Sequence, residues 1–166
     1  MLLARYQGNN FIGYNMDQHI SQQNLPLLLS KARETIISQF RSILKHFGLT
    51  EQQWRVLRIL FEEGEVEPCY LCEICDILSP SMTGILKRLK EMGLIGRRPM
   101  ETDKRRVLIF LTPKSEQLAE QILPLIRQQY RLIEEAWGAD LVAQIYQDMY
   151  TLIELKKVKV QQVELP

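Results

Sequence analysis

Basic side chains concentrate in residues 79–112, where they can meet phosphate groups. This segment holds eight bases and three acids, so its net charge is +5. The bases are Lys87, Arg88, Lys90, Arg97, Arg98, Lys104, Arg105 and Arg106. A positive patch of this size attracts nucleic-acid backbones. The alternative is a solvated face that only keeps the protein soluble.

The segment just before this patch has the opposite charge. Residues 51–78 hold seven acids and two bases, so their net charge is −5. The whole chain of 166 residues has 21 Lys+Arg against 20 Asp+Glu, and its formal net charge is +1. The near neutrality is therefore a cancellation between regions. It predicts DNA binding through one local surface, with modest non-specific affinity.

Three cysteines, Cys69, Cys72 and Cys75, form a C-x2-C-x2-C pattern. Zinc usually takes four ligands, and neither His19 nor His46 stands at ligand spacing. On a helix the three sulfurs would swing around the axis, so they would not converge easily. We expect small buried residues of a helix and no metal site. A redox switch is the alternative.

The spacing of apolar residues predicts helices on both sides of position 50. Steps of three and four over residues 25–47 predict an amphipathic helix that ends at Gly48. The segment Thr50–Gln53 has the capping-box pattern of a second helix, with Trp54 on its buried side.

Two shorter helices are predicted next. Residues 68–77 form the first. The second has Ser79 as N-cap and Pro80 at its first position. Its inward face consists of Met82, Ile85, Leu86, Leu89 and Met92. Gly93 ends it in a Schellman arrangement, with Leu94 packed on Leu89.

The apolar period changes after Gly93. Residues 94–98 and 106–111 predict two strands around a polar turn at 101–104. A long helix then spans 113–137, and Pro124 inside it should bend it or locally break its hydrogen-bond ladder. A last helix covers about 139–159.

This order predicts a mainly α fold with a small β-hairpin wing. Residues 49–112 form a winged helix-turn-helix DNA-binding domain. The helices within 22–48 and 113–160 carry more apolar surface than so small a centre can bury, so we expect them to join two copies into a homodimer. Residues 1–21 lack periodicity and are expected to be a flexible extension, or an addition upstream of a start at Met16.

The run from Asp103 to Thr112 follows a D-x-R-x-x-x-x-x-L-T signature, and it resembles the wing of the MarR family of winged-helix regulators. Segments 81–89 and 91–95 match the same family in the right order. Segments 32–34, 51–60 and 80–86 look like the regulators of homoprotocatechuate degradation operons within it. The resemblance covers about 25–155 and implies a dimeric repressor on a palindromic operator, released by a small aromatic acid.

The DNA-binding candidates follow from helix and wing together. They are Ser81, Thr83, Gly84, Lys87, Arg88, Arg97, Arg98, Asp103, Lys104, Arg105 and Arg106. Short side chains near the helix start allow close approach to base edges. The resemblance implies that Asp103 steadies Arg105, which enters the minor groove. Arg97, Arg98 and Arg106 are expected on backbone phosphates.

An aromatic carboxylate needs an apolar slot, a stacking surface and a cation. Related folds imply a site built from Arg33, Phe40, Trp54, Arg55 and Thr83. The alternatives are an ion pair for Arg33, plain core for Trp54, and for Arg55 a role in offsetting the acidic stretch.

Other classes of function lack their signatures. The chain has no glycine-rich phosphate loop and no nucleophile motif, so we expect no enzyme and no cofactor. No secretory signal or run of about 18 apolar residues stands out, so we expect no membrane partner and a cytoplasmic, nucleoid-associated bacterial protein. A helical adaptor module is a competing class. Within the family, redox sensing or efflux and stress control are the alternatives.

Overall fold

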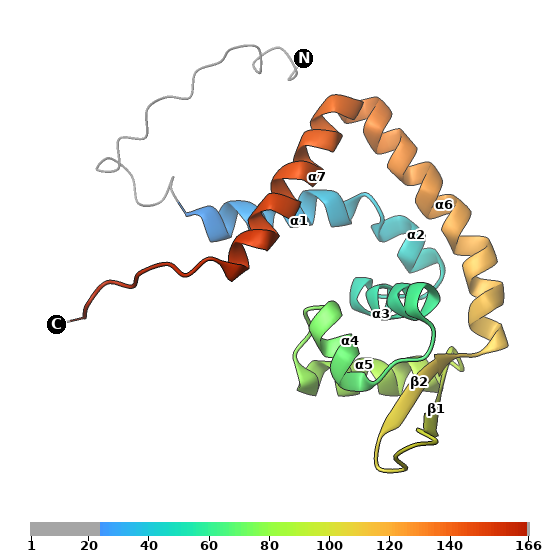
Figure 1. Cartoon of the computed structure of the whole chain (residues 1–166). Coiled ribbons are helices and arrows are strands. Elements are labelled where there is room, and N and C mark those ends of the chain that lie inside the picture. The colour runs from blue at the N-terminus through green and yellow to red at the C-terminus, as the bar shows by residue number, and fades with distance from the viewer. Residues whose placement is uncertain (1–23, 166) are drawn as a thin grey trace, which may run out of the picture. The chain divides into compact units, whose positions relative to one another are not determined.

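The computed structural model describes residues 24–165 and is mainly helical with one two-stranded sheet (Figure 1). This confirms the predicted fold class. In chain order the elements are α1 (Leu25–Ser38), α2 (Arg41–His46), α3 (Glu51–Glu63), α4 (Pro68–Ile74), α5 (Ser79–Glu91), β1 (Ile95–Pro99), β2 (Val107–Leu111), α6 (Pro113–Trp137), α7 (Ala139–Glu154) and a final 3-10 turn (Leu155–Lys157). The predicted N-terminal extension, and with it His19, lies outside the described residues.

The single helix predicted over 25–47 is wrong, because it is interrupted at Gln39 and Phe40. The chain also divides here into two compact units, one up to Ile37 and one from Ser38. The weak helix formers that precede the break favour it. Phe40 is buried, with its ring 4.8 Å from that of Tyr130 in α6. This contact fixes the start of α2 in the second unit.

The start of α3 is confirmed in detail, whereas α4 is shorter than predicted. Thr50 and Gln53 exchange both hydrogen bonds of a capping box. The predicted third helix ends at Ile74 rather than Ile77, because Asp76 adopts a left-handed conformation with φ 49°. The Ile77 amide then donates to the Cys72 carbonyl at 3.0 Å and closes the helix end.

Helix α5 ends as predicted but does not begin with the predicted cap. Ser79 is already the first residue of the helix, and the N-cap residue is Leu78, which makes no side-chain capping hydrogen bond. The Ser79 carbonyl accepts a hydrogen bond from the Thr83 hydroxyl at 3.1 Å. At the other end Gly93 has φ 72°, and the Leu94 amide donates to the Leu89 carbonyl at 2.9 Å. The Schellman arrangement is therefore confirmed.

The two predicted strands pair in antiparallel register, from Ile95 opposite Leu111 to Pro99 opposite Val107. A third contribution was not predicted. Val66, in the connection between α3 and α4, forms an isolated antiparallel bridge with Ile109. The bridge attaches the middle of β2 to the connection that precedes α4.

The main core lies where α3, α4, α5, α6 and β2 meet. Its fully buried side chains include Val56, Leu57, Leu60, Leu71, Met82, Leu89, Ile109 and Ile122. Helix α6 runs unbroken through Pro124, although proline cannot donate the backbone bond to Glu120. Both residues are exposed, so water can satisfy that carbonyl.

Helix α7 ends at Glu154, about one turn earlier than predicted, and none of its residues is buried within the single chain. Helix α1 likewise has no buried residue. Within the described residues, no single helix is long and apolar enough to cross a membrane. Only α4 and α5 taken together reach that length and composition, and they are bent by 113° at the break between them.

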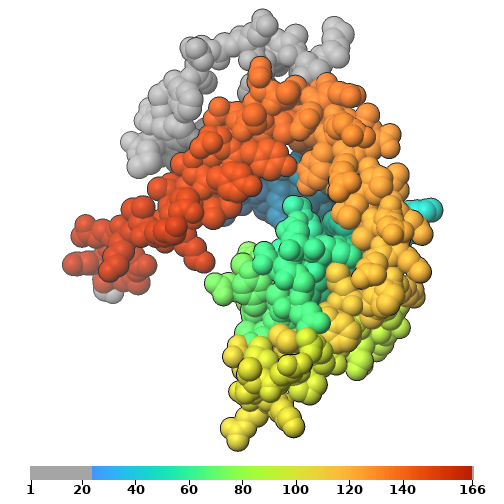
Figure 2. Space-filling view, turned by 45° about the vertical axis from the view of Figure 1, so that its right-hand side comes forward, coloured from blue at the N-terminus to red at the C-terminus, as the bar shows by residue number. Residues whose placement is uncertain are grey.

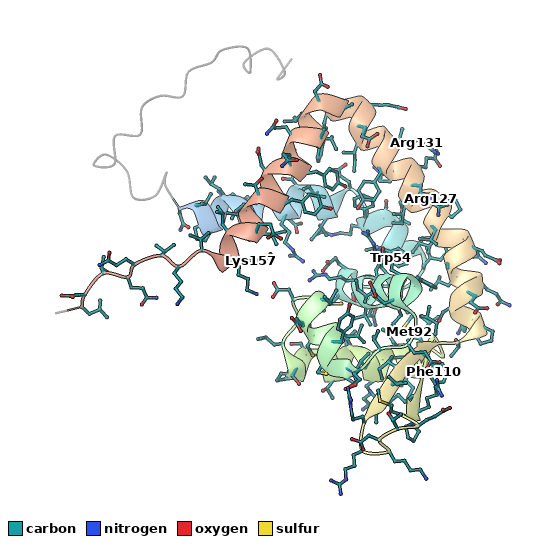
Figure 3. The ribbon with its side chains drawn as sticks, in the orientation of Figure 1. Trp54, Met92, Phe110, Arg127, Arg131 and Lys157 are labelled. Carbon is teal, nitrogen blue, oxygen red and sulfur yellow. The ribbon has the colours of Figure 1, made fainter. Side chains whose placement is uncertain are left out.

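Gly96 allows the Phe110 ring to lie across the sheet. The two residues are cross-strand partners, and a Cβ on Gly96 would lie 2.2 Å from Phe110 Cζ (Figure 3). We expect Gly96→Ala to lower the free energy of unfolding by about 1–3 kcal/mol, because the ring must leave its site. Urea unfolding at one fixed protein concentration measures this.

Gly84→Ala is the matched control for Gly96→Ala. Nothing lies within 4 Å of a Cβ on Gly84, which stands inside α5. In this variant the free energy of unfolding should rise by roughly 0.5–1 kcal/mol, because alanine favours a helix more than glycine does. Equal midpoints for the two variants would contradict the proposed packing of Phe110.

Candidate nucleic-acid interface

Helix α5 separates its buried face cleanly from its exposed face. Met82, Ile85, Leu86 and Leu89 are buried in the core. The predicted contact residues Ser81, Thr83, Gly84, Lys87 and Arg88 are all exposed. Because nothing crowds Gly84, this side of the helix can approach another surface closely. Lys87 also lies 3.9 Å from Glu91, which is a loose and exposed pair.

The wing tip is ordered by backbone hydrogen bonds. Asp103 Oδ1 accepts a hydrogen bond from the Arg105 amide at 3.0 Å, and the Asp103 carbonyl accepts from the Arg106 amide at 2.9 Å. The predicted pair between the Asp103 carboxylate and the Arg105 guanidinium is not among the ion pairs of residues 24–165. Asp103 therefore shapes the turn. Lys104 and Arg105 are both exposed at this tip, which projects from the rest of the domain (yellow in Figure 2).

Two wing arginines expected on phosphates have acidic partners within the chain. Arg98 Nη2 lies 2.6 Å from Glu65 Oε2 and its Nη1 lies 3.7 Å from Glu101. Arg106 pairs with Glu67. In each case the hydrogen bond to the glutamate, followed by its charge, raises the pKa of the arginine. Sequence reasoning missed both glutamates, although the change of charge from 51–78 to 79–112 was their signal.

A cleft of about 350 Å³ lies between the start of α5 and the wing. Its lining is apolar except for one hydroxyl and two guanidinium groups. The residues are Pro68, Thr83, Leu86, Arg97, Arg98, Pro99 and Val107. The structure thus brings Thr83 and Arg97, both predicted on the sequence, to one hollow beside the proposed DNA face.

The other candidate effector residues have different environments. Trp54 is only 9% exposed, and its ring centre lies 6.4 Å from that of Phe61 on the same helix (Figure 3). Arg55 is held by Glu51, at 2.5 Å, and by the Cys75 carbonyl, at 2.6 Å. This gives Arg55 a structural role that joins α3 to the end of α4. Arg33 belongs to the first unit and lies on α1.

The three cysteines differ in exposure, which corrects the expectation that all are buried. Cys75 is buried, Cys72 is intermediate and Cys69 is exposed, and all are free thiols. Burial raises the pKa of the Cys75 thiol, which reduces its thiolate fraction at neutral pH. In the described part of the chain, no group of three or more His, Cys, Asp or Glu side chains could hold a metal ion.

A helix-turn-helix followed by a wing, with exposed cations on the second helix and at the wing tip, defines a winged-helix DNA-binding protein. The MarR family model matches residues 49–107. The chain is 40% identical over 131 residues to the HTH-type transcriptional regulator FarR of Neisseria gonorrhoeae, which covers 79% of this chain and 88% of that protein. The chain therefore belongs to the MarR family and is a transcriptional regulator, not an enzyme.

Two further relatives are similar over most of their length. The homoprotocatechuate degradative operon repressor of Escherichia coli is 38% identical over 122 residues, which covers 74% of this chain and 82% of that protein. The crystal structure of NadR in complex with 4-hydroxyphenylacetate has a TM-score of 0.70 and 35% identity. The matched region covers 79% of this chain and 96% of the NadR chain.

Proposed function

We propose that the chain is a homodimeric repressor of an aromatic catabolic operon, and that a small aromatic acid releases it from a palindromic operator. The observation that carries the DNA half is the shared exposure of the α5 face and the cationic wing tip. In this arrangement α5 enters the major groove with Ser81, Thr83 and Gly84 toward base edges. Lys87, Arg88 and Arg97 contact phosphates, and Lys104 and Arg105 extend to the adjacent minor groove.

The dimer is supported by the apolar surface that the single chain leaves in water. Leu141, Met149, Leu152 and Leu155 of the C-terminal segment are each about 40–50% exposed. Soluble monomers rarely leave a continuous stripe of this kind uncovered. A two-fold dimer would bury the stripe and would match the symmetry of a palindromic site.

Fluorescence anisotropy with a labelled palindromic duplex tests operator binding. The duplex would be chosen from the DNA upstream of the gene, with a scrambled duplex of equal length as control. We expect tighter binding to the palindrome and a steep loss of affinity with added salt. Equal, salt-insensitive affinity for both duplexes would favour a helical adaptor module instead.

The effector half is supported by two relatives, one named for homoprotocatechuate degradation and one crystallised with 4-hydroxyphenylacetate. For this chain we propose that Arg33, on α1, binds the carboxylate of the effector. Thr83, which is exposed on α5, would couple effector binding to the DNA-binding face. Arg55 is left out because its guanidinium already joins Glu51 to the Cys75 carbonyl.

Titration calorimetry with 4-hydroxyphenylacetate tests Arg33 directly. We expect Arg33→Ala to weaken binding roughly ten- to hundredfold, the range for losing a hydrogen bond to a charged group. Lys31→Ala is the matched control, since it removes an exposed cation from the same helix. Binding like that of the wild type in Arg33→Ala would remove Arg33 from the site.

A further inference from the structure

The connection between α3 and α4 holds the wing at three successive residues. Glu65 accepts two hydrogen bonds from Arg98, at 2.8 Å from Nε and 2.6 Å from Nη2. Val66 exchanges both backbone hydrogen bonds with Ile109, at 3.1 and 2.8 Å. Glu67 accepts from Arg106, at 3.1 Å from Nε. Two side-chain pairs therefore flank one backbone bridge.

The two side-chain pairs lie where the paired strands end and the wing tip begins, whereas the Val66 bridge lies at the middle of β2. The last cross-strand pair joins Pro99 to Val107. Arg98 directly precedes this pair on β1, and Arg106 directly precedes it on the returning chain. Just beyond, the Met100 amide donates to the Arg106 carbonyl at 2.9 Å. The two arginines thus hold both sides of the hairpin at the base of the tip.

Their charge is already neutralised within the chain. Each arginine side chain is still about half exposed, at 45% for Arg98 and 54% for Arg106, but a phosphate oxygen that approached it would also be repelled by the carboxylate beside it. By contrast, Arg97, Lys104 and Arg105 have no acidic partner among the ion pairs of residues 24–165. One exposed pair contributes little alone, but here two pairs and a bridge act on the same three-residue segment.

We propose that Arg98 and Arg106 are positioning residues, which act with Glu65 and Glu67 to aim the wing tip at DNA and do not themselves contact phosphates. This inference rests on the proposed operator binding. It revises the phosphate contacts expected for these two arginines from the sequence. It also means that Glu65 and Glu67 support DNA binding, although their negative charge alone would repel the phosphates.

The direction in which a double substitution changes operator affinity tests the proposal. Glu65→Gln with Glu67→Gln removes two negative charges near DNA, which by electrostatics alone should strengthen binding. We expect roughly three- to tenfold weaker operator binding, because the tip loses its supports. Glu63→Gln with Glu73→Gln is the matched control. Both residues are exposed, and they line one hollow together with Glu65 and Glu67. This variant should bind as tightly as the wild type or slightly more tightly.

The salt dependence separates positioning from phosphate contact. Arg98→Gln and Arg106→Gln should lower affinity without changing the slope of log K against log salt. Loss of a real phosphate contact changes that slope by about 0.9 per wing. Arg105→Gln serves to show that the assay registers a lost contact. A slope change of that size for Arg98→Gln or Arg106→Gln would overturn the proposal, as would unchanged or tighter binding by the double glutamine variant.

A charge swap completes the test. Glu65→Arg and Arg98→Glu should each weaken binding, and their combination should restore it to within about threefold of the wild type. Failure of the swap to rescue binding counts against the positioning role. If the wild type itself does not distinguish operator from scrambled duplex, the proposed function fails. That result is separate from any comparison among these variants.

Discussion

Arg105→Ala is expected to lower operator affinity about ten- to hundredfold, the largest loss for any single wing residue. The side chain is exposed at the tip, and the tip is preorganised because Asp103 accepts a hydrogen bond from the Arg105 amide. Little ordering of the backbone is then required on binding. Substitution removes the guanidinium but keeps the amide, so the turn and the fold should persist.

An anisotropy titration at fixed salt measures this loss, with circular dichroism to check the fold. Arg127→Ala is the control. It removes an equally positive, exposed side chain from α6 (Figure 3), away from the wing. Operator affinity should be nearly unchanged in the control. An Arg105→Ala protein that still binds as the wild type does would refute the minor-groove role of the tip.

Local signals in the sequence predicted the elements well because they are encoded by neighbouring residues. The capping box at Thr50 and the glycine at position 93 each depend on residues a few positions apart. The break at Gln39 and Phe40 was missed because it is stabilised by a distant partner, Tyr130. Apolar spacing continues smoothly across the break, so periodicity alone could not reveal it.

The candidate site could likewise be predicted from the sequence only where local signals encode it. Its exposed residues on α5 were predictable, because a helix with one apolar face must expose the other. Which cations already have partners was not predictable. Glu65 and Glu67 reach Arg98 and Arg106 across more than thirty positions of sequence. Part of the near-zero net charge is thus a set of contacts between the acidic and basic segments. Within residues 79–112, the cations of Arg88, Arg97, Lys104 and Arg105 have no acidic partner among the ion pairs of the described chain, and all four are candidates for the DNA face.

The second large effect is expected from the dimer. Met149→Asp with Leu152→Asp places two charges on the exposed apolar stripe of α7, where each native side chain is 39% exposed in the single chain. Burying unpaired carboxylates between two copies is too costly, so we expect monomers. Each monomer then binds one half-site and loses the affinity that a dimer gains by binding both half-sites at once. Operator affinity should fall at least about hundredfold.

Light scattering coupled to size-exclusion chromatography gives the mass, and anisotropy gives the affinity. The matched control is Ala143→Asp with Gln147→Asp, which adds the same charge on the side of α7 away from the stripe. That variant should remain a dimer and bind the operator normally. Because α7 has no buried residue in the single chain, the first variant should keep its winged domain folded, with near-wild-type helicity. A dimer that survives the paired charges on the stripe would show that the two copies meet through another surface.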